Sequence, residues 1–198
     1  MSKIAIVKYN AGNVQSVLYA LERLGETAVW TDDPGELRRA KHVIFPGVGE
    51  ASSAMRHLRE RGLDEVIRGL KQPVLGICLG LQLFCRHSEE NDTDCLGIFD
   101  TAVRKFSGGA DRLKVPHMGW NTLHDLHGPL FKGVSEECFV YFVHSFFAEK
   151  NSNTAALAAY GEPFSAALER DNFYAVQFHP EKSGTIGQKI LSNFLKIN

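Results

Sequence analysis

The sequence predicts an α/β fold: a mostly parallel, doubly wound sheet with a nucleophile elbow, joined to a smaller antiparallel β layer. Apolar strand-like runs alternate with amphipathic helical segments up to residue 86, which is typical of a parallel sheet covered on both faces. A glycine-flanked cysteine follows the apolar run at 74–77 and indicates a strand-to-helix elbow. From residue 98 onward, strand-like runs separated by turns replace the alternation. Because no repeat or linker interrupts the 198 residues, we expect one domain over 1–198.

The strands expected in the first half are short and almost entirely apolar, as strands buried on both faces tend to be. We expect them at residues 4–9, 27–31, 43–45 and 74–77. The segments between them carry apolar side chains at helical spacing. The first helix has Asn13 as a suitable N-cap and ends at Gly25, and the second starts at Asp33-Pro34. We expect the remaining helices at residues 51–60, 63–70 and 79–86.

The second half is predicted to contain mainly strands and turns after a charged loop at 88–94. We expect strands at residues 101–106, 122–126, 138–147, 155–160, 164–169 and 173–178. Some should extend the large sheet, and others should form the smaller antiparallel layer. A final helix at 185–197 carries apolar side chains along one side.

Composition and charge exclude several classes of function. The formal net charge is −1, so we expect no broad basic surface for nucleic acid or for an anionic membrane. No apolar stretch approaches the roughly 20 residues that cross a bilayer, and the first residues lead into a strand rather than a secretory signal. The four cysteines show no C-x-x-C spacing. We therefore expect a reduced cytoplasmic protein with no metal and no cofactor.

Cys78 is the candidate nucleophile. It stands between an apolar strand and a helix, with Gly76 and Gly80 two positions away on either side. The backbone of a nucleophile at such an elbow is strained, and glycines remove side chains that would crowd it. In an open sheet, sites form beyond the carboxyl ends of the strands, where this cysteine should lie. A buried core cysteine beside two glycines is the alternative, and the pattern alone leaves both open.

A thiol nucleophile needs a base and a group that orients the base. His179 follows an apolar strand, and Glu181 lies two residues further on. Residues two apart in an extended chain point to the same side, and Pro180 favours that conformation. We therefore expect Glu181 to bind one imidazole nitrogen while the other faces Cys78. A turn with an incidental histidine is the alternative, and His144 also closes an apolar run but has no carboxylate beside it.

The loop Gly47-Val48-Gly49 directly follows the third expected strand and Pro46. A phosphate-binding G-x-G-x-x-G would need a third glycine, but Ser52 stands in that position. We expect the backbone N–H groups of Val48, Gly49 and Leu79 to form an oxyanion hole. A plain tight turn is the alternative for this loop.

Three motifs occur together along the chain. They are P-G-V-G at 46–49, G-I-C-L-G-L-Q at 76–82 and Q-F-H-P-E at 177–181. In this order they resemble the motifs of the class I, triad-type glutamine amidotransferases. The resemblance covers nearly the whole chain, and it implies the class I glutamine amidotransferase fold.

Further stretches are similar to one branch of that class, the glutaminase subunits of imidazole glycerol phosphate synthase in histidine biosynthesis. They are P-H-M-G-W-N at 116–121, Y-F-V-H-S at 141–145 and H-P-E-K-S at 179–183. This similarity implies a heterodimer with a cyclase subunit, a (β/α)8 barrel, to which ammonia passes directly. There it would be built into a phosphoribulosyl substrate to give imidazole glycerol phosphate and an aminoimidazole carboxamide ribonucleotide.

The resemblance also implies a reaction, the hydrolysis of L-glutamine to glutamate and ammonia. Cys78 attacks the side-chain amide carbonyl of glutamine. His179, oriented by Glu181, protonates the departing ammonia and then activates water against the γ-glutamyl thioester. The residues implied to bind glutamine are Gly47, Gly49, Gln82, Ser145 and Phe146. From their motif positions, the residues expected at the cyclase interface are Asn13, Trp120, Tyr141 and Lys182, and a structural role is the alternative for each.

The glutaminases of this family are weakly active until the loaded partner binds. A peptide flip at 47–49, which glycine makes sterically inexpensive, is the expected switch. The chain departs from the family at Phe146 and Phe147, where tyrosine is common, so a contact through a tyrosine hydroxyl is in doubt.

The sequence leaves two other identities open. The glutaminases of anthranilate or aminodeoxychorismate synthase usually carry G-H-Q where this chain has G-L-Q at 80–82. They also lack the H-M-G-W-N block. A relative that binds a partner without catalysis is a different class of answer, and the intact Cys78, His179 and Glu181 argue against it.

Overall fold

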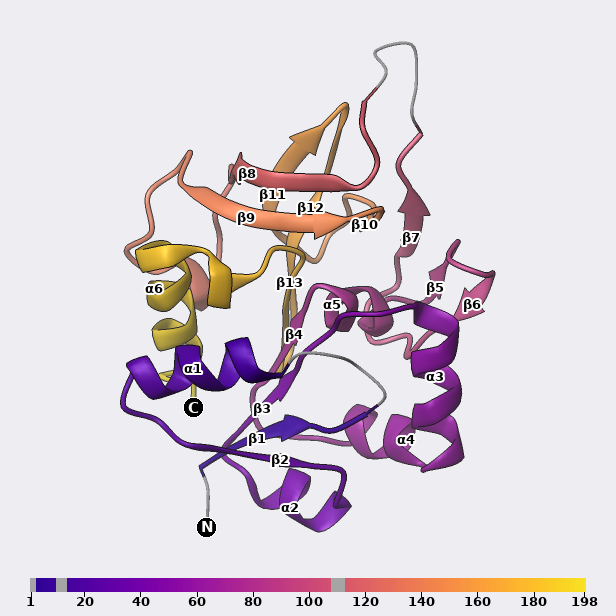
Figure 1. The fold of residues 1–198 in the computed structure, drawn as a ribbon, viewed down its shortest axis with the longest axis vertical. Helices are drawn as coiled ribbons and strands as arrows, with labels where there is room; N and C mark the ends of the chain where they lie inside the picture. The colour runs from indigo at the N-terminus through magenta and orange to yellow at the C-terminus, as the bar shows by residue number, and fades with distance from the viewer. Residues whose placement is uncertain (1–2, 10–13, 108–112) are drawn as a thin grey trace.

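The computed structural model describes residues 3–9, 14–107 and 113–198, and a large mixed sheet runs through them (Figure 1). Its strands follow the order β2-β1-β3-β4-β13-β12-β10-β7-β5-β6, and β11 pairs with β12 at the side. The parallel part comprises β1 (Ile4–Val7), β2 (Ala28–Thr31), β3 (His42–Phe45), β4 (Val74–Ile77) and β13 (Phe173–Val176). β13 comes from the far end of the chain, yet it lies directly beside β4.

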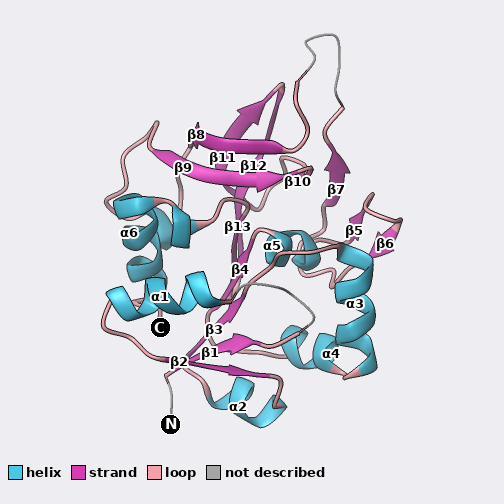
Figure 2. Cartoon of the chain, viewed as in Figure 1, coloured by secondary structure: helices cyan, strands magenta, loops and turns pink. Residues whose placement is uncertain are grey.

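The rest of the large sheet is mostly antiparallel. It consists of β5 (His87–Ser88), β6 (Thr93–Asp94), β7 (Ala102–Lys105), β10 (Phe146–Ala148), β11 (Thr154–Tyr160) and β12 (Glu162–Arg170). A separate two-stranded antiparallel sheet is formed by β8 (His117–Thr122) and β9 (Phe139–His144). Figure 2 shows it across the upper end of the large sheet, beyond β4 and β13.

Helices cover both faces of the parallel strands (Figure 1). One face carries α1 (Gln15–Arg23) and α6 (Gly184–Phe194). The other carries α2 (Pro34–Arg39), α3 (Ala51–Glu60), α4 (Leu63–Arg68) and α5 (Leu79–Phe84). Two 3-10 turns occur among the described residues, at Pro129–Phe131 and Pro180–Lys182. None of the helices in the described parts of the chain has the length and apolar character needed to cross a membrane.

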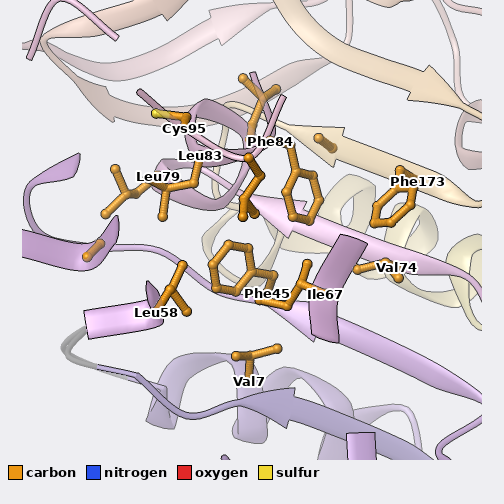
Figure 3. Close-up of a cluster of buried hydrophobic side chains, with 14 of the residues drawn as sticks. Val7, Phe45, Leu58, Ile67, Val74, Leu79, Leu83, Phe84, Cys95 and Phe173 are labelled. Carbon is orange, nitrogen blue, oxygen red and sulfur yellow. The ribbon is translucent and has the colours of Figure 1, made fainter. Parts of the chain in front are cut away.

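The core on the second face is organised around three phenylalanine rings (Figure 3). Phe84 of α5 stacks on Phe45 of β3 with ring centroids 5.4 Å apart, and it meets Phe173 of β13 edge-on at 5.6 Å. Phe45 and Phe84 are fully buried, and Phe173 is nearly so. This packing holds the short helix α5 against the ends of β3, β4 and β13, which is where the candidate site lies.

The predicted α/β class is confirmed, and so is the alternation of strands and helices in the first half. Asp33 caps α2 as expected, accepting a 2.7 Å hydrogen bond from the Glu36 N–H with Pro34 at the first helical position. Asn13 lies outside the described residues. Helix α5 ends at Phe84 rather than residue 86, because Cys85 turns to an extended conformation.

Two predictions in the second half were wrong. The strand expected at 122–126 lies earlier, at His117–Thr122, and past it His124 forms only an isolated bridge with Leu157. The pattern of apolar residues did not predict β8, because the inward face of this strand is polar and includes the buried His117.

The single strand expected at 138–147 is two strands in different sheets, separated at Ser145. The predicted loop at 88–94 contains a small hairpin, β5–β6.

Candidate active site

Cys78 stands at the junction of β4 and α5 with strained backbone dihedrals. Its φ is 54° and its ψ is −107°, a conformation that side chains with a Cβ rarely adopt. Its N–H donates to the Val176 carbonyl at 2.8 Å, which ties the elbow to β13. A Cβ at Gly80 would overlap the Phe45 carbonyl oxygen, and one at Gly76 would lie 2.7 Å from the Phe84 ring. The two glycines are therefore required by the close approach of α5 to the strand ends.

His179 and Glu181 lie beyond the end of β13 and form a buried pair. His179 Nδ1 donates to Glu181 Oε1 at 2.7 Å, and the two side chains are 2% and 6% exposed. The other ring nitrogen, Nε2, is buried without a hydrogen-bond partner on the same pocket as Cys78. Burial lowers the pKa of His179, but interactions with Cys78 and Glu181 outweigh it and raise the pKa to about 10. With Nδ1 bound to Glu181 and Nε2 without a partner on the pocket, the imidazole is placed to act as a base.

Both ring nitrogens of His144, the other histidine considered as a base, make hydrogen bonds outside the proposed triad. Its Nδ1 lies 2.7 Å from the Phe146 carbonyl oxygen, so this nitrogen carries the hydrogen and donates. Its Nε2 then accepts from Nδ1 of His117 at 2.9 Å. Burial lowers the pKa of His144 to about 3 and that of His117 to about 4. Both rings are neutral near pH 7, and neither nitrogen of His144 is free to take a proton from a thiol.

A pocket of about 340 Å³ opens above Cys78. Apart from Glu181, which lies behind His179, every residue predicted for catalysis, the oxyanion hole or glutamine binding lines it. These are Gly47, Val48, Gly49, Cys78, Leu79, Gln82, Ser145, Phe146 and His179. Four distant stretches of the chain thus meet at the carboxyl end of the parallel strands.

The side chain of Gln82 is fixed in one orientation. Its Nε2 donates to the Phe146 carbonyl at 2.9 Å and to Oε1 of Gln177 at 3.1 Å, which uses both amide hydrogens. Its own Oε1 accepts no hydrogen bond from the described residues. Gln82 can therefore present only an acceptor to a ligand in the pocket.

The loop at 47–49 holds one of the predicted oxyanion donors. The Leu79 N–H donates to the Gly47 carbonyl oxygen in a long hydrogen bond of 3.4 Å. Upstream, the buried Tyr9 hydroxyl donates to the Pro46 carbonyl at 2.5 Å. Gly49 has a φ of 127°, which a residue with a side chain would adopt only under strain. In this conformation the Leu79 N–H is engaged by the loop and is not available to an oxyanion.

Glu90 is a pocket residue that the sequence did not indicate. It is the only carboxylate among the described residues that line the pocket, and its Oε2 accepts a 2.7 Å hydrogen bond from the Ala51 N–H at the start of α3. Burial, with Glu50 nearby, raises the pKa of its carboxyl group, and the Ala51 hydrogen bond opposes this. It lies in the loop between β5 and β6, which looks in sequence like any charged surface turn, so only the fold reveals its place.

Three of the four predicted interface residues come together on the outer face of β8–β9. Trp120 is directly opposite Tyr141 and is 56% exposed, and Lys182 Nζ lies 6.0 Å from the Tyr141 ring centroid. Asn13, the fourth, lies outside the described residues. The same face carries two more exposed apolar side chains. We define the aromatic patch as Met118, Trp120, Phe139 and Tyr141.

Comparison with known proteins gives a consistent result over almost the entire chain. The family model described as "Glutamine amidotransferase class-I" matches residues 5–197. A protein of Bacteroides thetaiotaomicron named "Imidazole glycerol phosphate synthase subunit HisH" is 59% identical over 195 residues, covering 98% of this chain and 100% of the relative. The protein of the same name from Shewanella oneidensis is 45% identical, covering 98% and 96%.

Solved structures support the same fold. A structure titled as a glutamine amidotransferase superposes with a TM-score of 0.75 at 19% identity, covering 98% of this chain and 97% of the other. The PurLQS structure from Thermotoga maritima gives a TM-score of 0.73 at 19% identity, covering 98% of each chain. At these identities the likeness concerns the fold alone.

Proposed function

The chain belongs to the class I glutamine amidotransferase family, and from that premise we propose that it is the glutaminase subunit of an imidazole glycerol phosphate synthase. It hydrolyses L-glutamine to glutamate and ammonia and delivers the ammonia to a cyclase subunit for histidine biosynthesis. The observation that carries the proposal is the placement of Cys78 at the strained elbow, on the same pocket as His179, whose ring is hydrogen-bonded to the buried Glu181.

The chemistry proceeds through a covalent intermediate. The Cys78 thiol gives its proton to Nε2 of His179, and the sulfur attacks the side-chain carbonyl carbon of glutamine. The C–N bond then breaks, and the imidazolium returns the proton to the departing nitrogen, which leaves as ammonia. Water, deprotonated by the same imidazole, hydrolyses the γ-glutamyl thioester to glutamate and regenerates the thiol. Glu181 holds the ring with Nε2 toward the sulfur and stabilises its positive charge.

We assign stabilisation of the tetrahedral intermediates to backbone N–H groups of Val48, Gly49 and Leu79. The Leu79 N–H donates to the Gly47 carbonyl in this conformation, so it must be released before it can bind an oxyanion. A peptide flip within 47–49 would release that N–H and turn a further donor toward the pocket. We propose that binding of the cyclase favours the flipped conformation.

The amino-acid end of glutamine carries an ammonium and a carboxylate. The Glu90 carboxylate and the free Oε1 of Gln82 are acceptors suited to the ammonium. Gly49, Ser145 and Phe146 also line the pocket, and we assign their backbone groups to the carboxylate and the chain of the substrate.

Replacing Glu90 with glutamine should raise the KM for glutamine about ten- to a hundredfold, because a hydrogen bond between charged groups is worth about 1.5–3 kcal/mol. The kcat should change little, since Glu90 does not contact the reacting atoms. Steady-state glutaminase kinetics of the complex measure both constants. Glu89→Gln, at an exposed carboxylate next in the chain, is the matched control. An unchanged KM in Glu90→Gln would remove Glu90 from the binding site.

The aromatic patch is the surface that we assign to the cyclase, a (β/α)8 barrel bound as a heterodimer. It is continuous with the site: Val143 of β9 lines the pocket, and its carbonyl oxygen lies 3.8 Å from Cys78 Sγ. The Tyr141 carbonyl also accepts the His179 N–H at 2.9 Å. A partner seated here would both receive ammonia released beside β9 and contact the strand that supports His179.

Truncation of Trp120 to alanine should weaken cyclase binding about thirtyfold or more, since an aromatic hot spot contributes about 2 kcal/mol or more. Trp30→Ala is the matched control, because Trp30 is 45% exposed on β2, the edge strand of the large sheet, and is not part of the β8–β9 sheet. Titration of each variant with the cyclase measures the Kd. Equal affinities for the two variants would place the interface elsewhere.

The coupled assay tests the whole proposal. The chain and a candidate cyclase are co-purified, and release of glutamate from labelled glutamine is measured alongside formation of imidazole glycerol phosphate. Glutamate release that depends on the cyclase supports the proposal, and a complex that synthesises only from added ammonia overturns it. We also assign the protein to the cytoplasm, and its four free thiols agree with a reducing compartment.

A further inference from the structure

Gln177 is a fully buried polar side chain that the mechanism above does not use. It follows β13, whose Val176 is paired with Ile77 of β4, so Gln177 lies beside Cys78 across the two parallel strands. His179 is two residues further along, and Phe178 between them points into the core. The same strand end therefore supplies both the proposed base and Gln177 to the surroundings of the sulfur.

The two ends of the Gln177 amide have different partners. Nε2 donates toward Cys78 Sγ at 3.6 Å, and Oε1 accepts from Nε2 of Gln82 at 3.1 Å. The second contact settles the orientation of the amide, because only its oxygen can accept from an N–H. Gln177 does not line the pocket, so it acts on the sulfur and on Gln82 rather than on glutamine itself.

We propose that Gln177 is a further functional residue of the glutaminase: its N–H stabilises the Cys78 thiolate, and its carbonyl oxygen keeps the acceptor of Gln82 turned toward the substrate. A hydrogen bond to an anionic sulfur strengthens when the thiol proton moves to His179. The Val143 carbonyl, 3.8 Å from Sγ on another side, can accept only from the protonated thiol. Gln177 thus favours the reactive form. This inference deepens the proposed function and depends on it.

Two substitutions separate the two roles. Gln177→Met removes both contacts at similar volume, whereas Gln177→Glu, as a carboxylate, keeps an acceptor for Gln82 and has no donor for the sulfur. In the cyclase complex, kcat for glutamine should fall about ten- to a hundredfold in both variants, as expected for a hydrogen bond to a charged group. The KM should rise only in Gln177→Met. Gln72→Met, at a glutamine bonded to the Leu37 carbonyl far from the site, is the matched control.

The rate of Cys78 alkylation by iodoacetamide, followed by peptide mapping, would not change if Gln177 had only a structural role. At pH 7 the rate should fall about tenfold or more in both variants and stay unchanged in Gln72→Met. If the alkylation rate and kcat of the Gln177 variants stayed within twofold of the unsubstituted protein, the inference would be overturned. A variant that lost thermal stability while its alkylation rate stayed unchanged would also overturn it. Because alkylation needs no substrate, an inactive unsubstituted complex would overturn the proposed function without deciding this contact.

If neither variant folds, the contact between Gln177 and Cys78 can still be tested in the unsubstituted chain. Carbamidomethylation of Cys78 in ¹⁵N-labelled protein should shift the side-chain amide resonances of Gln177, and those of Gln72 should stay in place. Unshifted Gln177 resonances would overturn the contact.

Discussion

Replacing Cys78 with alanine should abolish glutamine-dependent synthesis by the complex, with a loss of about 10⁴-fold or more, while ammonia-dependent synthesis by the cyclase persists. Removal of a nucleophile that acts together with a base typically has an effect of this size. Among the described residues that line the pocket, Cys78 is the one thiol, and no hydrogen bond links the Ser145 hydroxyl to His179.

Cys138→Ala is the control for this result. Cys138 is a free, partly buried thiol that does not line the pocket, so its loss should leave both activities intact. If Cys78→Ala lost ammonia-dependent synthesis as well, Cys78 would have a structural role in the assembly. If it kept glutamine-dependent synthesis, another group would be the nucleophile.

The isolated chain should hydrolyse glutamine about 10²- to 10³-fold more slowly than the same chain bound to its loaded cyclase. One oxyanion donor contributes about 2.7–4 kcal/mol of transition-state stabilisation, and the Leu79 N–H is occupied by the Gly47 carbonyl. Binding at the aromatic patch would favour the conformation in which that N–H is free. The measurement is kcat for glutamate release with and without the cyclase and its ligand, at saturating glutamine.

Glutamate release by the isolated chain at the full rate of the complex would contradict this switch. A rise in kcat that does not require the cyclase ligand would show that docking alone suffices. Alkylation of Cys78 should differ little between the two states, because the switch concerns the oxyanion donors and not the pair of His179 and Glu181.

The parts of this molecule that depend on local chemistry were predictable from the sequence. The elbow could be predicted because α5 lies so close to β3 and β4 that residues 76 and 80 have no room for a Cβ. The expected contact between Glu181 and His179 is present, but Pro180–Lys182 form a 3-10 turn and not the extended segment on which that prediction rested. The structure brings these side chains together, and their roles remain proposals until the variants are measured. The single domain also remains a prediction.

The parts that depend on distant contacts were not predictable. Glu90 reaches the pocket through the β5–β6 hairpin, and its partner is a backbone N–H at residue 51. β8 is held by its pairing with β9, and its inward side chains His117 and Asn121 are polar. The sequence shows Gln177 as part of a motif but does not show its two contacts. These contacts join residues 95 and 99 positions apart in the chain.

Affinity labelling tests the nucleophile most directly. The complex is treated with a chloromethyl ketone analogue of glutamine, and the modified peptide is identified while glutaminase activity is followed. We predict one label per chain, on Cys78, with inactivation in proportion to labelling and protection by glutamine. Labelling of Cys78 that leaves glutamine hydrolysis intact, or inactivation by a label on a different residue, would contradict the assignment.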